Sequence, residues 1–142
     1  MFVRKDATDD QLVGLIEHWI DILANEDYEA FYNSLGFAML YQFEGLSGPE
    51  SIKSAIESYR SVVLYPGEEC FKVSHCSRTA GGNSEPDKYV ARYEPNSLKI
   101  KCAISYDLPL NGKWSDLGAE FVVLENSEST EYDNLSLEGI GP

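Results

Sequence analysis

The sequence has few cysteines and few histidines, which limits the metal and redox chemistry that it can support. Its three cysteines, Cys70, Cys76 and Cys102, form no C-x-x-C pair and have no histidine at a metal-ligand spacing, so we expect neither a disulfide framework nor a zinc site. Cys70 and Cys76 would lie about 20 Å apart along one strand, at roughly 3.3 Å per residue, which is too far for a disulfide. Because no cation or histidine is placed to lower the pKa of Cys76 or Cys102, both are interpreted as small apolar residues. We expect no metal and no cofactor.

Basic residues are also scarce. The chain has 11 Lys and Arg residues against 24 Asp and Glu residues, which gives a formal net charge of −13. Since phosphate contacts need clustered basic side chains, this composition argues against direct binding to nucleic acid. Two interpretations of the acidic surface stay open: it keeps the protein dissolved, or it steers a cationic partner to a binding site.

Long hydrophobic runs are absent. No stretch approaches the roughly 18 apolar residues of a membrane-spanning helix, and the N-terminal "MFVRKDATDD" lacks the apolar centre of a signal peptide. We therefore expect no membrane association and a cytoplasmic location. With 142 residues, of which 43% are hydrophobic, the chain is expected to form one domain over residues 1–142.

The first half of the chain has helical periodicity. "TDDQ" at residues 8–11 has the form of a capping box, and apolar residues then recur at spacings of three and four over residues 9–24. The same periodicity predicts a second helix over 27–35 and a third over about 49–62, which begins after a second capping box at Ser47. Residues 37–43, "FAMLYQF", are either a short strand or a buried continuation of the chain.

From residue 70 onward the periodicity changes to alternation, which predicts strands. A polar loop, "TAGGNSEPD" at residues 79–87, separates the first two strands, and its glycines are not at a strand-to-helix junction, so they predict no phosphate-binding loop. A turn follows at Pro95-Asn96. The buried faces are expected to carry Phe71, Val73 and His75 on the first strand, and Tyr89, Ala91 and Tyr93 on the second.

Asn111-Gly112 is the strongest local signal for a hairpin, because a type I′ turn needs positive φ at both central residues. If these two residues form the whole loop, Tyr106 pairs with Leu117 and Asp107 pairs with Asp116. The apolar residues of both strands then share one face, as burial requires. Pro109 is a candidate for a bulge that would relieve the opposition of like charges. Residues 125–142 form an acidic C-terminal segment, with a short last strand near Leu135 and a loose end.

Helices followed by antiparallel strands predict an α+β fold, with N-terminal helices packed on a curved, mainly antiparallel sheet. The stretches "LIEHWIDILANEDYEAFYNSLG" and "GPESIKSAIESYR", followed by long terminal strands, resemble the nuclear-transport-factor-like superfamily. This is the cone-shaped α+β barrel shared by ketosteroid isomerases and polyketide cyclases. In size and charge the chain is also similar to bacterial immunity proteins that neutralise toxins.

The resemblance to isomerases and cyclases implies a site inside the cone, with an acid or base and an oxyanion donor. His75, Tyr89, Tyr93 and Tyr106 are the inward candidates for such a pocket. The long strands offer no carboxylate on the apolar face, so a base would have to come from Glu44 or Asp21. Packing is the competing interpretation of these tyrosines, and a satisfied core histidine that of His75.

The other candidate surface is the outward face of the sheet together with the C-terminal segment. An exposed tryptophan beside carboxylates suits a protein interface, in which the aromatic ring anchors the partner and the acids select a basic one. We therefore expect a non-enzymatic immunity or antitoxin protein that blocks a basic toxin, such as a nuclease. A small-molecule binder or enzyme, and a homodimer formed through the sheet, are the alternatives. The expected partner-binding residues are Asp107, Trp114, Asp116, Glu120, Glu128, Glu131 and Asp133.

Overall fold

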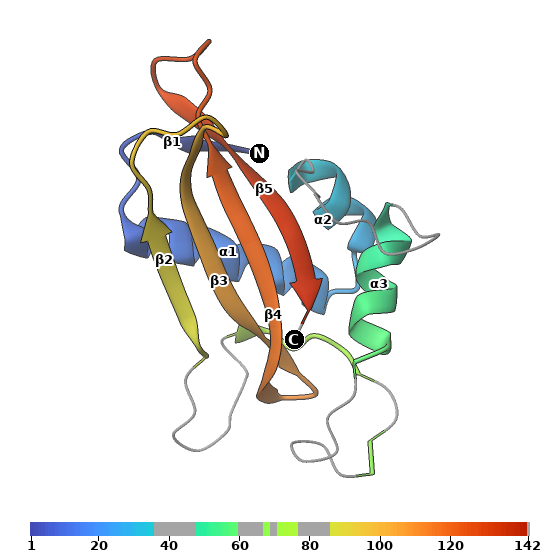
Figure 1. The fold of residues 1–142 in the computed structure, drawn as a ribbon. Helices are drawn as coiled ribbons and strands as arrows, with labels where there is room; N and C mark the ends of the chain where they lie inside the picture. Colours follow the sequence, from blue (N-terminus) through green and yellow to red (C-terminus); the bar gives the residue numbers. More distant parts are fainter. Residues whose placement is uncertain (36–47, 60–66, 69–70, 77–85, 142) are drawn as a thin grey trace.

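The computed structural model describes residues 1–35, 48–59, 67–68, 71–76 and 86–141. In these ranges, three helices pack on one face of a five-stranded antiparallel sheet, so the predicted α+β class is confirmed (Figure 1). None of the described helices combines the length and the apolar character that crossing a membrane would require. The elements are β1 (Phe2–Arg4), α1 (Asp9–Ala24), α2 (Tyr28–Leu35), α3 (Pro49–Glu57), β2 (Lys88–Arg92), β3 (Ile100–Leu110), β4 (Lys113–Leu124) and β5 (Tyr132–Gly141).

Helix α1 begins and ends where the sequence predicts. The Thr8 hydroxyl accepts a hydrogen bond from the backbone N–H of Gln11, and the Gln11 side chain accepts one from the backbone N–H of Thr8, so the capping box is formed. The apolar stripe of the helix, which includes Ile16 and Ile20, is fully buried against the sheet. Figure 1 shows α1 crossing behind the sheet.

Helices α2 and α3 lie beside β5 (Figure 1). The predicted second helix is confirmed, and Asp27 caps it by accepting a hydrogen bond from the backbone N–H of Ala30. Helix α3 begins at Pro49 as predicted, but its N-cap is Gly48 without a side-chain bond, and it ends at Glu57. Ser47, residues 37–43 and residues 60–62 of the expected third helix lie outside the described residues.

The sheet has the strand order β1-β5-β4-β3-β2, and all its pairings are antiparallel. In the described part of the chain the sheet is open, with β1 and β2 at its edges, so a closed cone is not formed there. Strand β5 pairs with β1 through its first three residues, Tyr132 to Asn134, and with β4 from Asn134 to Gly141. The expectation of a short last strand with a loose end was therefore wrong, and β1 was not predicted.

The β3–β4 hairpin turns at Asn111-Gly112, where both residues have positive φ, 48° and 83°. The predicted pairing holds beside the turn, where Pro109 faces Trp114. A bulge then shifts the register by two residues between Asp107 and Pro109, so that Asp107 faces Gly118 rather than Asp116. The bulge at Pro109 is thus confirmed. Because the shift is an even number of residues, the apolar side chains keep their predicted face.

The first two predicted strands differ from the prediction. In residues 71–76 only Val73 pairs with the sheet, by an isolated bridge to Leu110, although Phe71 and Val73 are buried as expected. In β2 it is Val90 that pairs with buried Ile104. Tyr89 and Ala91 therefore lie on the opposite face from the one predicted. Cys70 and residues 79–85 of the predicted loop lie outside the described residues.

The two faces of the sheet differ in composition. The inner face packs on the helices through residues such as Ile104, Tyr106 and Phe121, all fully buried. The opposite face, called the outer face below, is not covered by any described helix (Figure 1). It consists of Tyr89 and Ala91 on β2, Ala103, Ser105 and Asp107 on β3, Glu120 and Val122 on β4, and Ser136 and Glu138 on β5.

Candidate functional site

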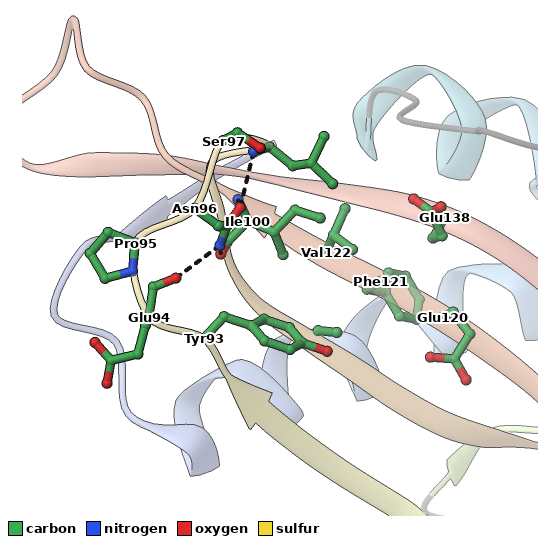
Figure 2. Close-up of a pocket in the computed structure, with 12 residues that line it drawn as sticks. Tyr93, Glu94, Pro95, Asn96, Ser97, Ile100, Glu120, Phe121, Val122 and Glu138 are labelled. Atoms are coloured by element: carbon green, nitrogen blue, oxygen red, sulfur yellow. Dashed lines mark hydrogen bonds between the residues drawn. The ribbon is translucent and has the colours of Figure 1, made fainter.

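A groove of about 620 Å³ lies on the outer face (Figure 2). Its floor includes Ala103 on β3 and Val122 on β4, which pair with each other across the sheet. Its rim is the turn of residues 93–98, which carries two exposed apolar side chains, Tyr93 (53% exposed) and Leu98 (69% exposed). The outer groove is thus a concave apolar surface that is open to a partner.

The side chain of Asn96 holds the rim together. Its Oδ1 accepts hydrogen bonds from the backbone N–H groups of Leu98 and Ile100, at 3.1 and 3.2 Å. Its Nδ2 donates to the carbonyl oxygens of Glu94 and Ile100, at 2.9 and 2.8 Å (Figure 2). Four backbone groups are bound by one side chain, so the rim is a fixed turn and the predicted turn at Pro95-Asn96 is confirmed.

Two carboxylates, that of Glu120 on β4 and that of Glu138 on β5, line the same end of the outer groove (Figure 2). Glu120 Oε1 accepts a hydrogen bond from the Ser105 hydroxyl at 2.7 Å, which orients the carboxylate. Glu138 is half-buried, and burial raises its pKa. No hydrogen bond or ion pair joins its carboxylate to another described residue. The ring of Tyr93 extends from the rim toward this end of the groove (Figure 2).

More acidic side chains continue the outer face beyond Glu120. Burial raises the pKa of Asp107 to about 6, and the nearby charges of Asp87, Asp116 and Glu120 add to the increase. Asp116 also accepts a hydrogen bond from the hydroxyl of buried Tyr59, which follows α3. Of the expected partner-binding residues, Asp107, Asp116 and Glu120 are therefore brought together in one acidic cluster.

The other four expected residues are not part of this cluster. Glu128 and Glu131 are exposed on the loop between β4 and β5, at the opposite end of the sheet from the Asn111-Gly112 turn (Figure 1). Trp114 was expected to be exposed, but it is half-buried and packs edge-to-face on Tyr106, with 6.1 Å between ring centroids. The bulge opposite Leu108 interrupts the alternation of β4 and turns the tryptophan to the inner side.

Asp133 was also expected on the acidic surface, and this was wrong. Its side chain is 1% exposed and forms salt bridges with Lys5 at 2.7 Å and with Lys101 at 2.6 Å. Burial alone would raise its pKa, but the hydrogen bonds from Lys101 and Lys5 outweigh burial, and the pKa is lowered. Asp133, on β5, is the shared anion of a structural ion-pair network that joins Lys5, which follows β1, to Lys101 on β3.

Two of the cations near the rim, Arg92 and Lys101, are paired with carboxylates, whereas Lys99 is exposed and forms no ion pair with another described residue. Arg92 forms a salt bridge with Asp9 at 2.8 Å, and Lys101 pairs with Asp133 as described above. None of these cations lines the outer groove. The charge that the groove presents to a partner therefore comes from its carboxylates.

The expected interior pocket is assembled only in part. Tyr89 and Tyr93 are 60% and 53% exposed, so their predicted inward orientation was wrong. Tyr106 is fully buried as expected, and His75 is partly exposed, with its Nδ1 3.6 Å from Asp21 Oδ1. Glu44, the other candidate base, lies outside the described residues.

The contacts of Tyr106 are those of a satisfied core residue. Its hydroxyl donates a hydrogen bond to Glu17 Oε2 at 2.8 Å and lies 4.0 Å from the Cys76 sulfur. Burial and the nearby Asp21 carboxylate raise the pKa of Cys76 to about 11, so the thiol is protonated at neutral pH and is a poor nucleophile. Burial also raises the pKa of Cys102. Among the described residues, no group of three His, Cys, Asp or Glu side chains is arranged to hold a metal ion.

Sequence analysis missed Glu138, Leu98 and the role of Tyr93 in the groove. Glu138 falls in the segment that was read as a loose end, and a register shift between Glu120 and Phe121 places it over the groove. The apolar residues Leu135, Leu137 and Ile140, all of them buried, were the available signal for a long strand there. Comparison of the chain with protein-family models, curated proteins and solved structures found no match.

Proposed function

We propose that this chain is a binding protein, without catalytic activity of its own, that holds a basic protein partner on the outer face of its sheet. The observation that carries the proposal is the outer groove, in which exposed apolar side chains lie beside carboxylates that form no ion pair with another described residue. Aromatic and apolar anchors with selective charges around them are the usual composition of a protein interface.

The charge of the outer face favours a partner of another kind over a second copy of the chain. Two copies joined through this face would bring Glu120, Glu138 and Asp107 of one copy near those of the other. Like charges in close contact are unfavourable, and the net charge of −13 adds to the repulsion. A basic protein gains from the same charges, both in affinity and in the rate of encounter.

Within this proposal the chain is an immunity or antitoxin protein, and its partner is a basic toxin domain such as a nuclease. The acidic outer face would occupy the surface that the toxin uses for its polyanionic substrate and would block it sterically. This more specific statement rests on charge, on size and on the resemblance to the cone-shaped superfamily and to immunity proteins. No observation specifically favours the alternative of an enzyme or small-molecule binder with a site between the helices and the sheet.

The test compares two variants with the same change in net charge at different places. The outer-face variant is Glu120→Gln with Glu138→Gln, and the loop variant is Glu128→Gln with Glu131→Gln. The tagged wild-type chain and both variants are used to capture proteins from a lysate of the source cells, at low and at high ionic strength.

We expect the wild type and the loop variant to capture the same basic protein at low ionic strength. The outer-face variant should bind it at least about tenfold more weakly, since truncating one member of a buried, hydrogen-bonded charge pair costs about 2 kcal/mol or more. Equal weakening by both variants would show that only the overall charge matters and would contradict the proposal. So would capture of partners that carry no net positive charge.

A further inference from the structure

The two carboxylates of the outer groove differ in what already binds them. Glu120 has one oxygen engaged by Ser105, which fixes its position. Glu138 is half-buried beside apolar surface and has no described partner. A partly desolvated carboxylate without a partner is unfavourable, and a cation placed against it would remove that cost.

The rest of the groove matches a particular cationic side chain. The floor, formed by Ala103 and Val122, is apolar and can cover an aliphatic stem. The exposed ring of Tyr93 extends toward the carboxylates (Figure 2) and offers a flat face to a planar cation. A guanidinium is planar and weakly hydrated, and its fork of N–H donors can reach two carboxylates at once, whereas an ammonium is a compact, strongly hydrated point charge.

We infer that the outer groove receives one arginine side chain of the basic partner, with its guanidinium between Glu120 and Glu138 and against the ring of Tyr93. This inference rests on the proposed function, because it names the group by which the same face would recognise its partner. The stem of the arginine lies over Ala103 and Val122. The acidic cluster around Asp107 then surrounds this anchor and supplies the longer-range attraction.

The test uses three small probes in place of the partner: N-acetyl-arginine methylamide, its lysine counterpart and its citrulline counterpart. Citrulline has nearly the shape of arginine but no charge. Each probe is titrated into the ¹⁵N-labelled chain, and the backbone amide shifts of Leu98, Ala103 and Val122 are followed by NMR.

We expect saturable shifts with arginine in the millimolar range, binding at least about fivefold weaker with lysine, and no saturation with citrulline. Glu138→Gln should weaken arginine binding about fivefold or more, since it removes a charge-assisted hydrogen bond. Tyr93→Leu keeps an apolar rim and should reduce the preference for arginine over lysine. The matched control, Glu128→Gln, should bind arginine as the wild type does.

Equal binding of arginine and lysine, or arginine binding that Glu138→Gln leaves unchanged, would overturn the inference. Such a result is distinct from failure of the proposed function. If the outer-face variant loses the captured partner while the arginine probe shows no preference, the function stands and this anchor is wrong. If the probe binds in the groove but both charge variants capture the partner equally, the anchor stands and the proposed interface is wrong.

Discussion

Asp107 is a carboxylate in an environment that disfavours its charge. It is half-buried, and the acidic groups near it are those of Asp87, Asp116 and Glu120, so its pKa is about 6 in the folded chain instead of the ordinary 3.8. The folded state therefore binds more protons than the unfolded state between these two values. Raising the pH from about 4 to about 6 should lower the free energy of unfolding, and the loss is complete above that window.

Replacing the Asp107 carboxylate with an uncharged group tests whether its pKa is raised in the folded chain. We predict that Asp107→Asn raises the free energy of unfolding at pH 7 by about 1 kcal/mol, after allowance for solvent screening, because asparagine carries no charge. The melting temperature should rise by roughly 3 °C in a chain of this size. The difference should be several times smaller at pH 4 and should vanish about one pH unit below that, because Asp107 is then protonated in both the folded and the unfolded wild type. Urea unfolding from pH 4 to pH 8 measures it.

Glu128→Gln is the control for this experiment. Glu128 is exposed on the loop between β4 and β5, so its replacement should change the stability by less than about 0.5 kcal/mol at every pH. An effect of Asp107→Asn that is equally large at pH 4 and pH 7 would mean that the substitution acts through packing and not through the charge.

The burial of single acidic side chains could not be predicted from the sequence. The sequence marks Asp133 and Glu131 as two acidic residues of one polar segment, yet Glu131 is exposed and Asp133 is 1% exposed between two lysines. The lysines come from residues 5 and 101, so the network depends on tertiary contacts between distant parts of the chain. No local pattern predicts such a partner.

At the level of elements, the rim of the outer groove depends on Asn96. We predict that Asn96→Ala lowers the free energy of unfolding by about 1 to 2 kcal/mol, since four backbone groups lose their partner and exposed ones regain only water. Amide hydrogen exchange at Leu98 and Ile100 should become at least about tenfold faster. Exchange measured by NMR on the free chain tests this directly.

Ser97→Ala provides the comparison in the same turn, because the serine side chain makes no hydrogen bond to a described residue. It should leave the exchange rates of both amides unchanged. If Asn96→Ala also leaves them unchanged, the turn is held by other contacts, and a fixed rim can no longer be assumed for the groove.

The elements that local chemistry specifies were predictable from the sequence. The capping box of Thr8 and Gln11 set the start of α1, and the Asn111-Gly112 turn and the bulge at Pro109 set the hairpin. Which face of β2 is buried was not predictable, because Tyr89 and Val90 point to opposite faces and both residue types are common on the buried face of a sheet. Only pairing with β3 decides which of them is buried.

The same limit applies to β1 and β5. Strand β1 has three residues, and it pairs with a strand more than a hundred residues away in sequence. Strand β5 contains acidic and glycine residues that lower its propensity, but it is held between β1 and β4. Tertiary pairing overrides local preference in both cases, and this brings Glu138 into the groove.

At the scale of the whole molecule, the helices cover one face of the sheet, and the groove with its carboxylates lies on the other. The helices bury the inner face and complete one hydrophobic core, whereas the described helices leave the outer face uncovered. The composition predicted an acidic surface and a basic partner, but not which face would be used. The structure gathers Asp107, Asp116 and Glu120 in one acidic cluster and leaves Glu128 and Glu131 on the loop between β4 and β5, at the end of the sheet opposite the Asn111-Gly112 turn.

The central claim is that the outer face holds the partner, and methyl cross-saturation NMR on the complex tests it most directly. The partner is the basic protein captured by the wild-type chain, and its protons are saturated while the methyl groups of the labelled chain are observed. We predict loss of signal at Leu98, Ala103 and Val122 and none at Val13, Leu15 and Ile22 on α1. Loss of signal confined to the α1 methyl groups would place the partner on the helical side and contradict this account.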